Sequence, residues 1–316
     1  MSIKWGVLGT GGIAREFTED LLSHTEMTVS AVGSRDLSKA YAFREGVKGY
    51  GSYEELVHSD VDAIYVATPH QVHCENTLLA LNSGKPVLCE KPFAVNAIQA
   101  KAMAGAAKEN DLLLMEAMWT RYLPHIQRVR ELMHELGEVH NVQADHGQSL
   151  LHIKRLIDPN LAGGALLDLG IYPVSFAYFV LGKPEKITAK GVIKNGVDTQ
   201  TSAIFEYEGG RHAVINTIMD SKTPTTASIN GTKARLELET SFYRPTNMRL
   251  IYNDGREIEI KNEYRGHGLR EQAIYFEKML ITGKKDSELL PIAETVSIME
   301  TLDEIRAQIG LRYPFE

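Results

Sequence analysis

The sequence predicts an α/β protein with two domains, the first built on a doubly wound parallel sheet and the second on an open, largely antiparallel sheet. The chain has 316 residues, about twice the ~150 residues of an ordinary domain. Short β-rich runs alternate with longer helical runs from residue 3 to 116, which is typical of βαβ units. Beyond about residue 122, strands follow one another with short turns, which favours antiparallel pairing. The expected domains are residues 1–122 and 123–316.

Composition and charge exclude several classes of protein. Lys and Arg number 34 against 41 Asp and Glu, a net charge of -7, so nucleic acids and anionic membranes are disfavoured as partners. The most apolar runs, such as 174–181, are shorter than the ~20 residues of a membrane-spanning helix. Two cysteines, Cys74 and Cys89, predict free thiols in a reducing compartment. We therefore expect a cytoplasmic globular protein.

The first half predicts five strands and five helices. Each strand is a continuous apolar run, as in a sheet that is covered by helices on both faces. The strands are expected at 3–8, 27–33, 63–67, 86–89 and 112–115, and the helices at 13–23, 38–45, 53–58, 74–82 and 97–109.

The second half predicts an antiparallel sheet with helices before, within and after it. The helices are expected at 124–136, 166–181, 269–281 and 292–309, and the strands at 138–145, 186–193, 201–207, 211–219, 234–239 and 256–260. The connectors 208–210, 230–231 and 253–255 contain the glycines that tight turns with positive φ require. Both faces of 211–219 carry apolar residues, so the second face is covered either by a second subunit or by ordinary edge packing.

The first strand ends in a glycine-rich turn, Gly9-Thr10-Gly11-Gly12-Ile13-Ala14. This fits the pattern G-x-G-x-x-G/A at a strand-to-helix junction, where a pyrophosphate meets backbone N–H groups and the positive end of a helix. Gly9 makes the turn, Gly11 admits the phosphate and Ala14 allows close helix packing. The pattern predicts that the first domain is a dinucleotide-binding Rossmann domain.

The end of the second strand bears on which dinucleotide is bound. An NAD-preferring site places an acidic residue here, whereas this chain has Ser34 and Arg35, which suit the 2′-phosphate of NADP. Asp36 is expected to cap the next helix, and NAD stays possible if its carboxylate turns inward instead. Lys39 either adds positive charge or is simply solvated.

Two further turns lie at the carboxyl ends of buried strands, where open α/β sheets bind ligands. The first is Thr68-Pro69-His70, in which we expect His70 to have a structural role, and the second is Glu90-Lys91-Pro92. Lys91 closes a buried strand beside a proline, which is unusual for a surface charge. In the second half, Asp168 and Tyr172 are four residues apart and so share one face of a helix. Spacing alone leaves open whether they are a helix-start carboxylate and a core ring or a functional pair.

These motifs together resemble the Gfo/Idh/MocA oxidoreductase family over essentially the full length. The glycine turn and Glu90-Lys91-Pro92 carry the resemblance, and the stretches 116–124 and 162–172 are similar to the branch of dimeric dihydrodiol dehydrogenases and NADP-dependent D-xylose dehydrogenases. The resemblance implies a homodimer or higher homo-oligomer through the second sheet. It also implies that Lys91 and Tyr172 are the catalytic pair, with Asp168 nearby.

The resemblance also extends the set of candidate residues. Trp119 and Arg121 lie where that branch shapes its substrate pocket, and Arg155 is a weaker candidate. The cofactor-binding candidates are Gly9, Thr10, Gly11, Gly12, Ile13, Ala14, Ser34, Arg35, Lys39, Thr68, Pro69, His70, Glu90, Lys91, Trp119 and Arg121, and the substrate-binding candidates are Lys91, Trp119, Arg155, Asp168 and Tyr172. No metal site is expected.

The favoured hypothesis is an enzyme that transfers hydride between NADP and a small-molecule substrate, a trans-dihydrodiol or an aldose such as D-xylose. Tyr172 would exchange the hydroxyl proton, Lys91 would stabilise the phenolate, and Asp168 would orient a neighbouring group. In a second assignment Lys91 itself carries the proton. The alternative function is a non-catalytic dinucleotide sensor of the same fold, against which the presence of Lys91, Asp168 and Tyr172 together argues.

Overall fold

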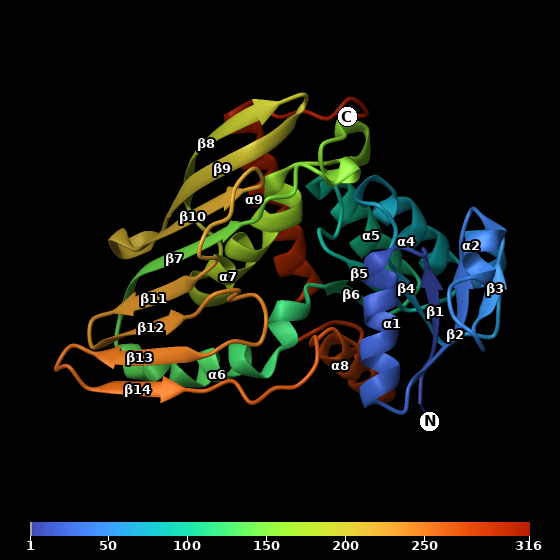
Figure 1. Ribbon diagram of the computed structural model, residues 1–316, viewed down its shortest axis with the longest axis horizontal. Helices are drawn as coiled ribbons and strands as arrows, with labels where there is room; N and C mark the ends of the chain where they lie inside the picture. The colour runs from blue at the N-terminus through green and yellow to red at the C-terminus, as the bar shows by residue number, and fades with distance from the viewer. Residues whose placement is uncertain (1) are drawn as a thin grey trace. The chain divides into compact units, whose positions relative to one another are not determined.

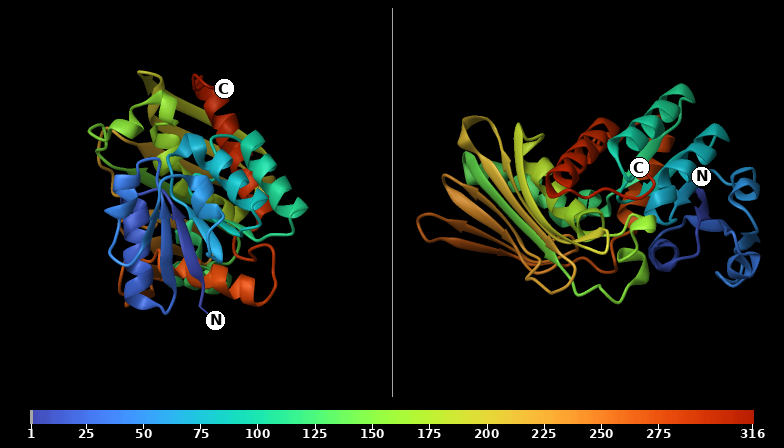
Figure 2. Two further views of the ribbon diagram at one scale, coloured as in Figure 1. Left: turned by 90° about the vertical axis from the view of Figure 1, so that its right-hand side faces the viewer. Right: turned by 90° about the horizontal axis from the view of Figure 1, so that it is seen from above.

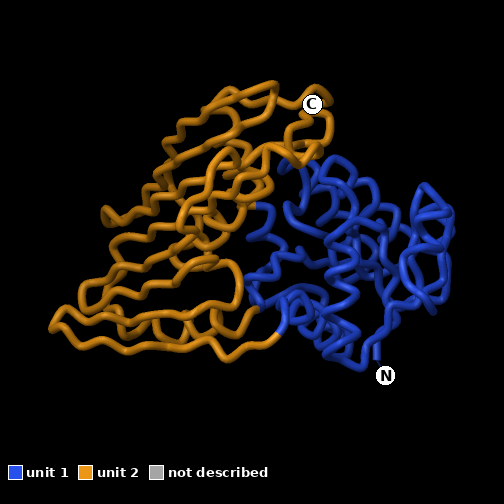
Figure 3. Tube along the Cα trace, in the orientation of Figure 1, with its two compact units in different colours: residues 1–122, 266–296 blue, residues 123–265, 297–316 orange. Residues whose placement is uncertain are grey.

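The structure is a computed structural model that describes residues 2–316, and it contains two compact units (Figure 3). Unit 1 comprises the chain up to Tyr122 together with Gly266–Val296, and unit 2 comprises Leu123–Arg265 and Ser297–Glu316. The sequence-based division assigned all of 123–316 to the second domain, so the placement of 266–296 is a correction. The reason is packing, because Phe276 in this segment lies against Trp5 with ring centroids 5.0 Å apart.

Unit 1 contains a six-stranded parallel sheet in the order β3-β2-β1-β4-β5-β6. This is the expected doubly wound arrangement, with β1 and β4 adjacent where the strand order reverses. The strands are β1 Lys4–Leu8, β2 Thr28–Gly33, β3 Lys48–Tyr50, β4 Ala63–Val66, β5 Val87–Glu90 and β6 Leu114–Ala117. The sequence missed β3, because its three partly exposed residues at the sheet edge carry no apolar run.

Helices cover both faces of this sheet, with α1 packed against α8 and α4 packed against α5 (Figures 1 and 2). Asp36 caps α2 as expected, since its carboxylate accepts from the backbone N–H of Ser38 at 3.0 Å. A stacked pair, Phe17 and Tyr65 with centroids 3.9 Å apart, joins α1 to β4 in the core. The helices are α1 Gly12–His24, α2 Leu37–Tyr41, α3 Tyr53–Val57, α4 His73–Asn82, α5 Ala97–Glu109 and α8 Arg270–Ile281.

Unit 2 contains an eight-stranded sheet in the order β14-β13-β12-β11-β7-β10-β9-β8 (Figure 1). All neighbours are antiparallel except β7 and β10, which run parallel. The sequence missed two of these strands, β11 and β13. The strands are β7 Val139–Gly147, β8 Lys186–Lys194, β9 Val197–Glu206, β10 His212–Ile218, β11 Ala227–Gly231, β12 Ala234–Leu238, β13 Met248–Tyr252 and β14 Glu257–Ile260.

The glycine connectors agree with the prediction in two places and differ in one. Gly209, Gly210 and Gly255 have positive φ values of 74°, 75° and 90°. Gly231 was expected in a turn, but it ends β11, at a shift of register against β7. Glycine stands there because an added Cβ would lie 2.2 Å from the carbonyl oxygen of Leu136.

Helices lie on one face of the eight-stranded sheet, where α7 packs against β7 and β10 (Figure 2). The helices of this unit are α6 Pro124–Leu132, α7 Ile171–Leu181 and the greater part of α9 Ile292–Ile309. One helical stretch of the described residues, Pro159–Leu181, is long and apolar enough to cross a membrane by length and composition, and 83% of its most apolar window is buried. That burial is typical of the core helix of a folded unit.

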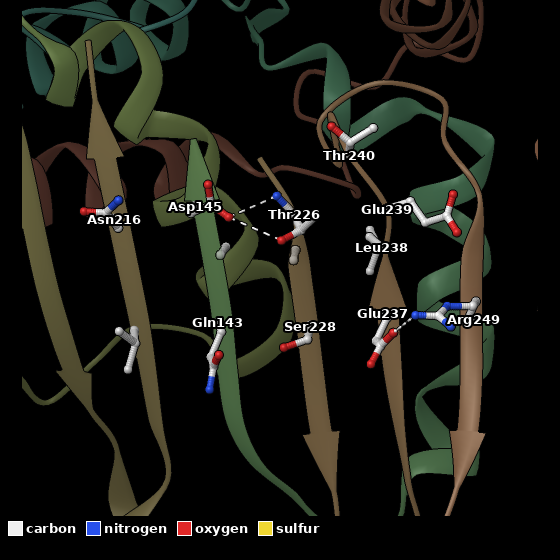
Figure 4. A pocket seen from close by; sticks show the side chains of 13 residues that line it. Gln143, Asp145, Asn216, Thr226, Ser228, Glu237, Leu238, Glu239, Thr240 and Arg249 are labelled. Carbon is white, nitrogen blue, oxygen red and sulfur yellow. Dashed lines mark hydrogen bonds and ion pairs between the residues drawn. The ribbon is translucent and has the colours of Figure 1, made fainter. Parts of the chain in front are cut away.

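The opposite face of this sheet is not covered by any helix of the described residues (Figure 2). Ile204 on β9 and Val214 on β10 are direct partners across the strands and are 45% and 39% exposed. Because β10 is hydrogen-bonded to a strand on each side, edge packing does not explain its apolar outer residue. A groove of about 620 Å³ lies on this face, between β10 and β13, with Asp145, Glu237 and Arg249 in its lining (Figure 4).

Candidate active site

The glycine turn after β1 forms an open cradle at the start of α1. Gly9 has φ of +110°, and a Cβ there would lie 2.5 Å from the carbonyl oxygen of Ala67. A Cβ on Gly11 or Gly12 would meet no atom within 4 Å, and no side chain caps this 13-residue helix. Free N–H groups and open space at a helix N-terminus fit the pyrophosphate of a dinucleotide. Ala14 is fully buried, in keeping with close helix packing.

Ser34 and Arg35 stand at the carboxyl end of β2. The backbone N–H of Ser34 donates to Tyr50 at 3.1 Å, and its hydroxyl accepts from the backbone N–H of Asp36. Asp36 is engaged in capping α2, and Lys39 lies 3.7 Å from its carboxylate. Burial raises the pKa of Tyr53, and the positive charge of the nearby Arg35 guanidinium opposes this rise. The hydroxyl and guanidinium are thus the polar groups at the position where the ribose of a dinucleotide is recognised.

Two buried carboxylates hold the turn that carries Lys91. The backbone N–H of Lys91 donates to Glu90 at 3.2 Å, and the N–H of Phe93 donates to Glu116 at 3.2 Å. The hydroxyl of Tyr65 also donates to Glu90. Pro92 has no N–H, so both backbone N–H groups of residues 91–93 are hydrogen-bonded to a buried acid. This arrangement fixes the backbone from which the Lys91 side chain extends.

Glu116 is a residue whose role was not predicted from the sequence. It is 1% exposed and also accepts from the hydroxyl of Thr295 at 3.0 Å. Burial raises its pKa to about 7, against the opposing effects of Thr295, the Phe93 N–H and Arg121. The acid is therefore neutral in the folded protein at pH values where it is ionised in the unfolded chain.

This shift makes the contribution of Glu116 to stability depend on pH. Between its unfolded pKa near 4.5 and its folded pKa of about 7, folding takes up a proton. The free energy of unfolding therefore falls as pH rises through this window, by up to about 3 kcal/mol. In the variant Glu116→Gln this loss is absent, so the variant gains stability relative to the native protein between pH 5 and pH 8.

Urea unfolding at pH 5 and pH 8 measures the effect. Glu19→Gln is the control, because Glu19 is exposed and Arg44 lowers its pKa, so its contribution does not fall as pH rises. An equal difference between native protein and Glu116→Gln at both pH values contradicts the prediction.

Trp119 and Arg121 follow β6 in a 3-10 turn. The Trp119 ring lies 5.0 Å from the ring of His267, centroid to centroid. The Arg121 side chain is buried, with an ion pair to Glu294 at 2.8 Å and a hydrogen bond to the carbonyl of Leu289 at 3.0 Å. These contacts fasten Arg121 within unit 1, while its expected contact with a cofactor stays a prediction.

Asp168 and Tyr172 lie in unit 2 at the start of the long apolar helix. The sequence predicted one continuous helix over 166–181, but Leu166–Gly170 is a π-turn and α7 begins at Ile171, a local widening that often occurs at functional sites. Both guanidinium NH2 groups of Arg155 contact the Oδ1 atom of Asp168 at 3.2 Å. The structure thus places two of the candidate substrate-binding residues, Arg155 and Asp168, in direct contact.

The Tyr172 ring belongs to an aromatic cluster that sequence reasoning missed. Its centroid lies 5.2 Å from His146 and 4.8 Å from Tyr243, and those two rings stack at 4.3 Å. The amide of Gln148 bridges them, 2.8 Å from Nε2 of His146 and 3.2 Å from the Tyr243 hydroxyl. Val142, Ala144 and His146 are alternate residues of β7 and so point to the same buried face. This alternation could have identified His146 as a buried histidine from the sequence. Tyr243 lies in a loop and carries no such signal.

A buried carboxylate anchors the start of this helix. Asp198 is 0% exposed and accepts from the backbone N–H of Leu166 at 2.9 Å and from the hydroxyl of Thr201 at 2.8 Å. A Cβ on Gly164 would lie 2.2 Å from the Oδ1 atom of Asp198, so the preceding loop requires glycine. Burial raises the pKa of Asp198 to about 6.

The candidate residues are thus divided between the units. Unit 1 holds the nucleotide cradle and Lys91, and unit 2 holds Arg155, Asp168 and Tyr172. Residues 2–316 contain no group of three His, Cys, Asp or Glu placed to hold a metal ion. The available chemistry is that of an amine, a phenol and a carboxylate, groups that hold or move protons.

The glycine cradle and the two-unit architecture agree with the family match. Residues 3–118 match the family described as "Oxidoreductase family, NAD-binding Rossmann fold", and residues 126–237 match its "GFO/IDH/MocA C-terminal domain". The chain belongs to the Gfo/Idh/MocA oxidoreductase family, as the motifs predicted.

Curated relatives and solved structures narrow this assignment. The trans-1,2-dihydrobenzene-1,2-diol dehydrogenase of Mus musculus is 37% identical, over 99% of each chain, and that of Xenopus tropicalis is 34% identical, over 99% of this chain and all of the relative. KijD10, a 3-ketoreductase from Actinomadura kijaniata in complex with NADP and TDP-benzene, has a TM-score of 0.88 and 25% identity, over 98% of each chain. The protein is an oxidoreductase with an NAD(P)-binding Rossmann domain.

Two glycines of the cradle are expected to separate folding from cofactor binding. Gly9→Ala places a Cβ 2.5 Å from a carbonyl oxygen at positive φ, so its free energy of unfolding falls by about 1–3 kcal/mol. Gly11→Ala meets open space and keeps its stability, but it weakens dinucleotide binding about tenfold or more, because the new methyl group occupies phosphate space. Urea unfolding measures the free energy of unfolding of each variant, and a dinucleotide titration followed by intrinsic fluorescence measures its affinity. Unchanged affinity in Gly11→Ala contradicts this placement of the pyrophosphate.

Proposed function

We propose that this protein is an NADP-dependent dehydrogenase that transfers hydride between NADP and a vicinal diol or sugar, either a trans-dihydrodiol or an aldose such as D-xylose. The observation that carries the proposal is the full-length similarity to dihydrodiol dehydrogenases at 34–37% identity. The Arg155–Asp168 pair, with Asp168 four residues before Tyr172 in the chain, supports it, because a polyol substrate needs hydrogen-bonding groups around the reacting hydroxyl.

The preference for NADP rests on the end of β2. A 2′-phosphate requires hydrogen-bond donors and positive charge, which Ser34 and Arg35 supply. The carboxylate that would favour NAD is absent from β2, and Asp36 is engaged with Ser38. NADP in the KijD10 complex is consistent with this preference. NAD binds more weakly in this proposal, because it leaves the guanidinium without an anion.

The proton transfer is assigned to Tyr172 with help from Lys91. Bound NADP supplies the ring that accepts or donates the hydride. A tyrosine phenol ordinarily loses its proton near pH ~10, so it needs a neighbouring cation to act as a base at neutral pH. Lys91 provides that ammonium and hydrogen-bonds the substrate oxygen. Asp168 orients a neighbouring hydroxyl, and Arg155 holds its carboxylate in place.

A panel of trans-dihydrodiols, aldoses and dicarbonyls, assayed with NADP and NAD separately at 340 nm, tests the proposal. We expect turnover with a diol or an aldose and a preference for NADP. In Arg35→Ala the affinity for NADP falls about 10- to 100-fold, since a charged hydrogen bond to phosphate is lost, whereas the affinity for NAD changes little. Tight dinucleotide binding without turnover on any substrate overturns the proposal and favours a non-catalytic sensor.

We further propose that a second copy of the chain covers the open face of the eight-stranded sheet. The exposed pair Ile204 and Val214 supports it, because apolar residues on a broad sheet face mark association surfaces. Light scattering after gel filtration is expected to give a homodimer or a higher homo-oligomer. The double variant Ile204→Glu/Val214→Glu should be a monomer, whereas Ile98→Glu, at a residue that is 79% exposed on α5, should keep the native mass. A monomeric native protein contradicts the proposal.

We also propose a cytoplasmic location. Both cysteines are free thiols, with Cys89 buried, and burial raises the pKa of Cys89 and so keeps it a neutral thiol. Such thiols are typical of a reducing compartment. Cell fractionation followed by immunoblotting checks the location, and recovery in a membrane or secreted fraction contradicts it.

A further inference from the structure

The further inference concerns His73, the first residue of α4, which is 0% exposed. Its Nδ1 atom lies 2.8 Å from the carbonyl oxygen of Pro92, and its Nε2 atom lies 2.8 Å from the carbonyl oxygen of Thr68. Both distances are those of strong hydrogen bonds. One imidazole ring therefore joins the turn after β4 to the turn after β5.

The two partners of this ring fix its protonation state. A carbonyl oxygen accepts hydrogen bonds and never donates them. A neutral imidazole has one N–H, so its second nitrogen would present a lone pair to an oxygen at 2.8 Å, which is repulsive and costly in a buried place. Only the imidazolium donates from both nitrogens. We infer that His73 is held as an imidazolium and that this buried cation positions the turn that carries Lys91.

A buried cation requires a compensating charge and satisfied donors. Glu90, two residues before Pro92 in the chain, is 4% exposed and supplies a carboxylate in the same turn. The hydroxyl of Tyr65 donates to that carboxylate. The ring centroid of His70 lies 5.7 Å from that of His73. The other ionisable side chains on α4 and on the helices and strands that pack against it are Cys74 and Glu75 on α4, Tyr53, Glu54 and Glu55 on α3, Cys89 on β5 with Lys91 just beyond it, and Lys101, Lys108 and Glu109 on α5.

The Lys91 turn is thereby held at one backbone group of each of three consecutive residues, Lys91, Pro92 and Phe93. Glu90 accepts from the N–H of Lys91, Glu116 accepts from the N–H of Phe93, and His73 donates to the carbonyl between them. The turn after β4 has two hydrogen bonds to α4. His73 contacts the carbonyl of Thr68, and Asn76 donates to the Thr68 hydroxyl at 3.0 Å. His73 is thus a positioning residue, and its effect on catalysis rests on the proposed function, in which Lys91 is catalytic.

His125 in unit 2 is a matched control for this state. It is also buried, but its Nε2 atom has a single backbone partner, the carbonyl of Phe242 at 3.1 Å. Burial lowers the pKa of His125 to about 4, so its ring is neutral near pH 7. The two histidines differ in the number of carbonyl oxygens that face the ring, and they should differ in the number of ring protons.

Histidine-selective ¹⁵N labelling of the full-length protein tests the inference. At pH 7.5 we expect two ring N–H protons on His73 and one on His125, resolved by one-bond and long-range ¹H–¹⁵N correlations. Neutron diffraction from deuterated crystals shows the ring protons of His73 and His125 directly, without the need to assign NMR signals with variants. The variant His73→Gln donates to only one carbonyl, so kcat is expected to fall about tenfold, whereas His125→Gln stays within about twofold of native.

The outcomes separate this inference from the proposed function. A single ring proton on His73 between pH 6 and pH 8 overturns the inference, whatever the turnover. Two ring protons in a protein that turns over no substrate leave the inference standing and remove the proposed function. If His73→Gln does not fold, the spectra of the native protein decide alone.

Discussion

Replacing Tyr172 by phenylalanine is expected to lower kcat by about 10²- to 10⁴-fold, the range for losing a general acid or base. The substitution removes one oxygen from a ring that packs against His146 and Tyr243, so the cluster keeps its shape. Tyr172 is not among the residues expected to bind the dinucleotide, so the Kd for NADP should not change. A fall in kcat at constant Kd assigns the phenol to the chemical step.

The control is Tyr243→Phe, which removes the same atom from a neighbouring ring. The Tyr243 hydroxyl accepts from Gln148, and its loss should cost about tenfold or less. Near-normal turnover in Tyr172→Phe contradicts the first assignment and transfers the proton to Lys91. In that case Lys91→Met alone should abolish turnover, and the pH profile of kcat should follow the amine rather than the phenol.

The parts of the fold that the sequence predicts are those with strong local signals. The five strands that were predicted in the parallel sheet are continuous apolar runs. The glycine turn after β1 can be recognised from residue types alone, because positive φ and room for phosphate each require glycine. The helix Ala97–Glu109 lies where its pattern placed it. Local signals fail where pairing decides the structure. Strands β11 and β13 are five residues each, and their neighbours in the sheet define them.

The same distinction holds for the candidate site. Lys91, Asp168 and Tyr172 were predicted because motifs contain them. His73, Glu116 and Asp198 were missed because each acts through a partner distant in sequence, as when Asp198 accepts from Leu166, 32 residues away. A buried acid or histidine has no sequence pattern of its own, and its role follows from which backbone groups the fold brings to it. Only the three-dimensional structure identifies these positioning residues.

Asp20→Ala is expected to lower the free energy of unfolding by about 3–5 kcal/mol, the cost of breaking a buried ion pair. Asp20 on α1 is 6% exposed, and its Oδ1 atom accepts from the backbone N–H of His267 and from Nη1 of Arg270, at 3.3 and 3.1 Å. Its Oδ2 atom accepts from the backbone N–H groups of Gly268 and Arg270, at 3.2 and 2.9 Å. One carboxylate thus fastens the start of 266–296 to the first helix of the chain.

Urea unfolding of Asp20→Ala and of Asp20→Asn measures this anchor. The asparagine keeps one acceptor oxygen and should fall between the native protein and the alanine variant. Asp60→Ala is the matched control, since Asp60 forms an ion pair with Lys4 at 2.7 Å but its side chain is 94% exposed, and such surface pairs contribute little. If Asp20→Ala lowers the free energy of unfolding as little as Asp60→Ala does, the Asp20 carboxylate does not anchor 266–296 to the rest of unit 1. That outcome would assign the attachment of 266–296 to its other contacts, such as the packing of Phe276 on Trp5 and the ion pair of Glu294 with Arg121.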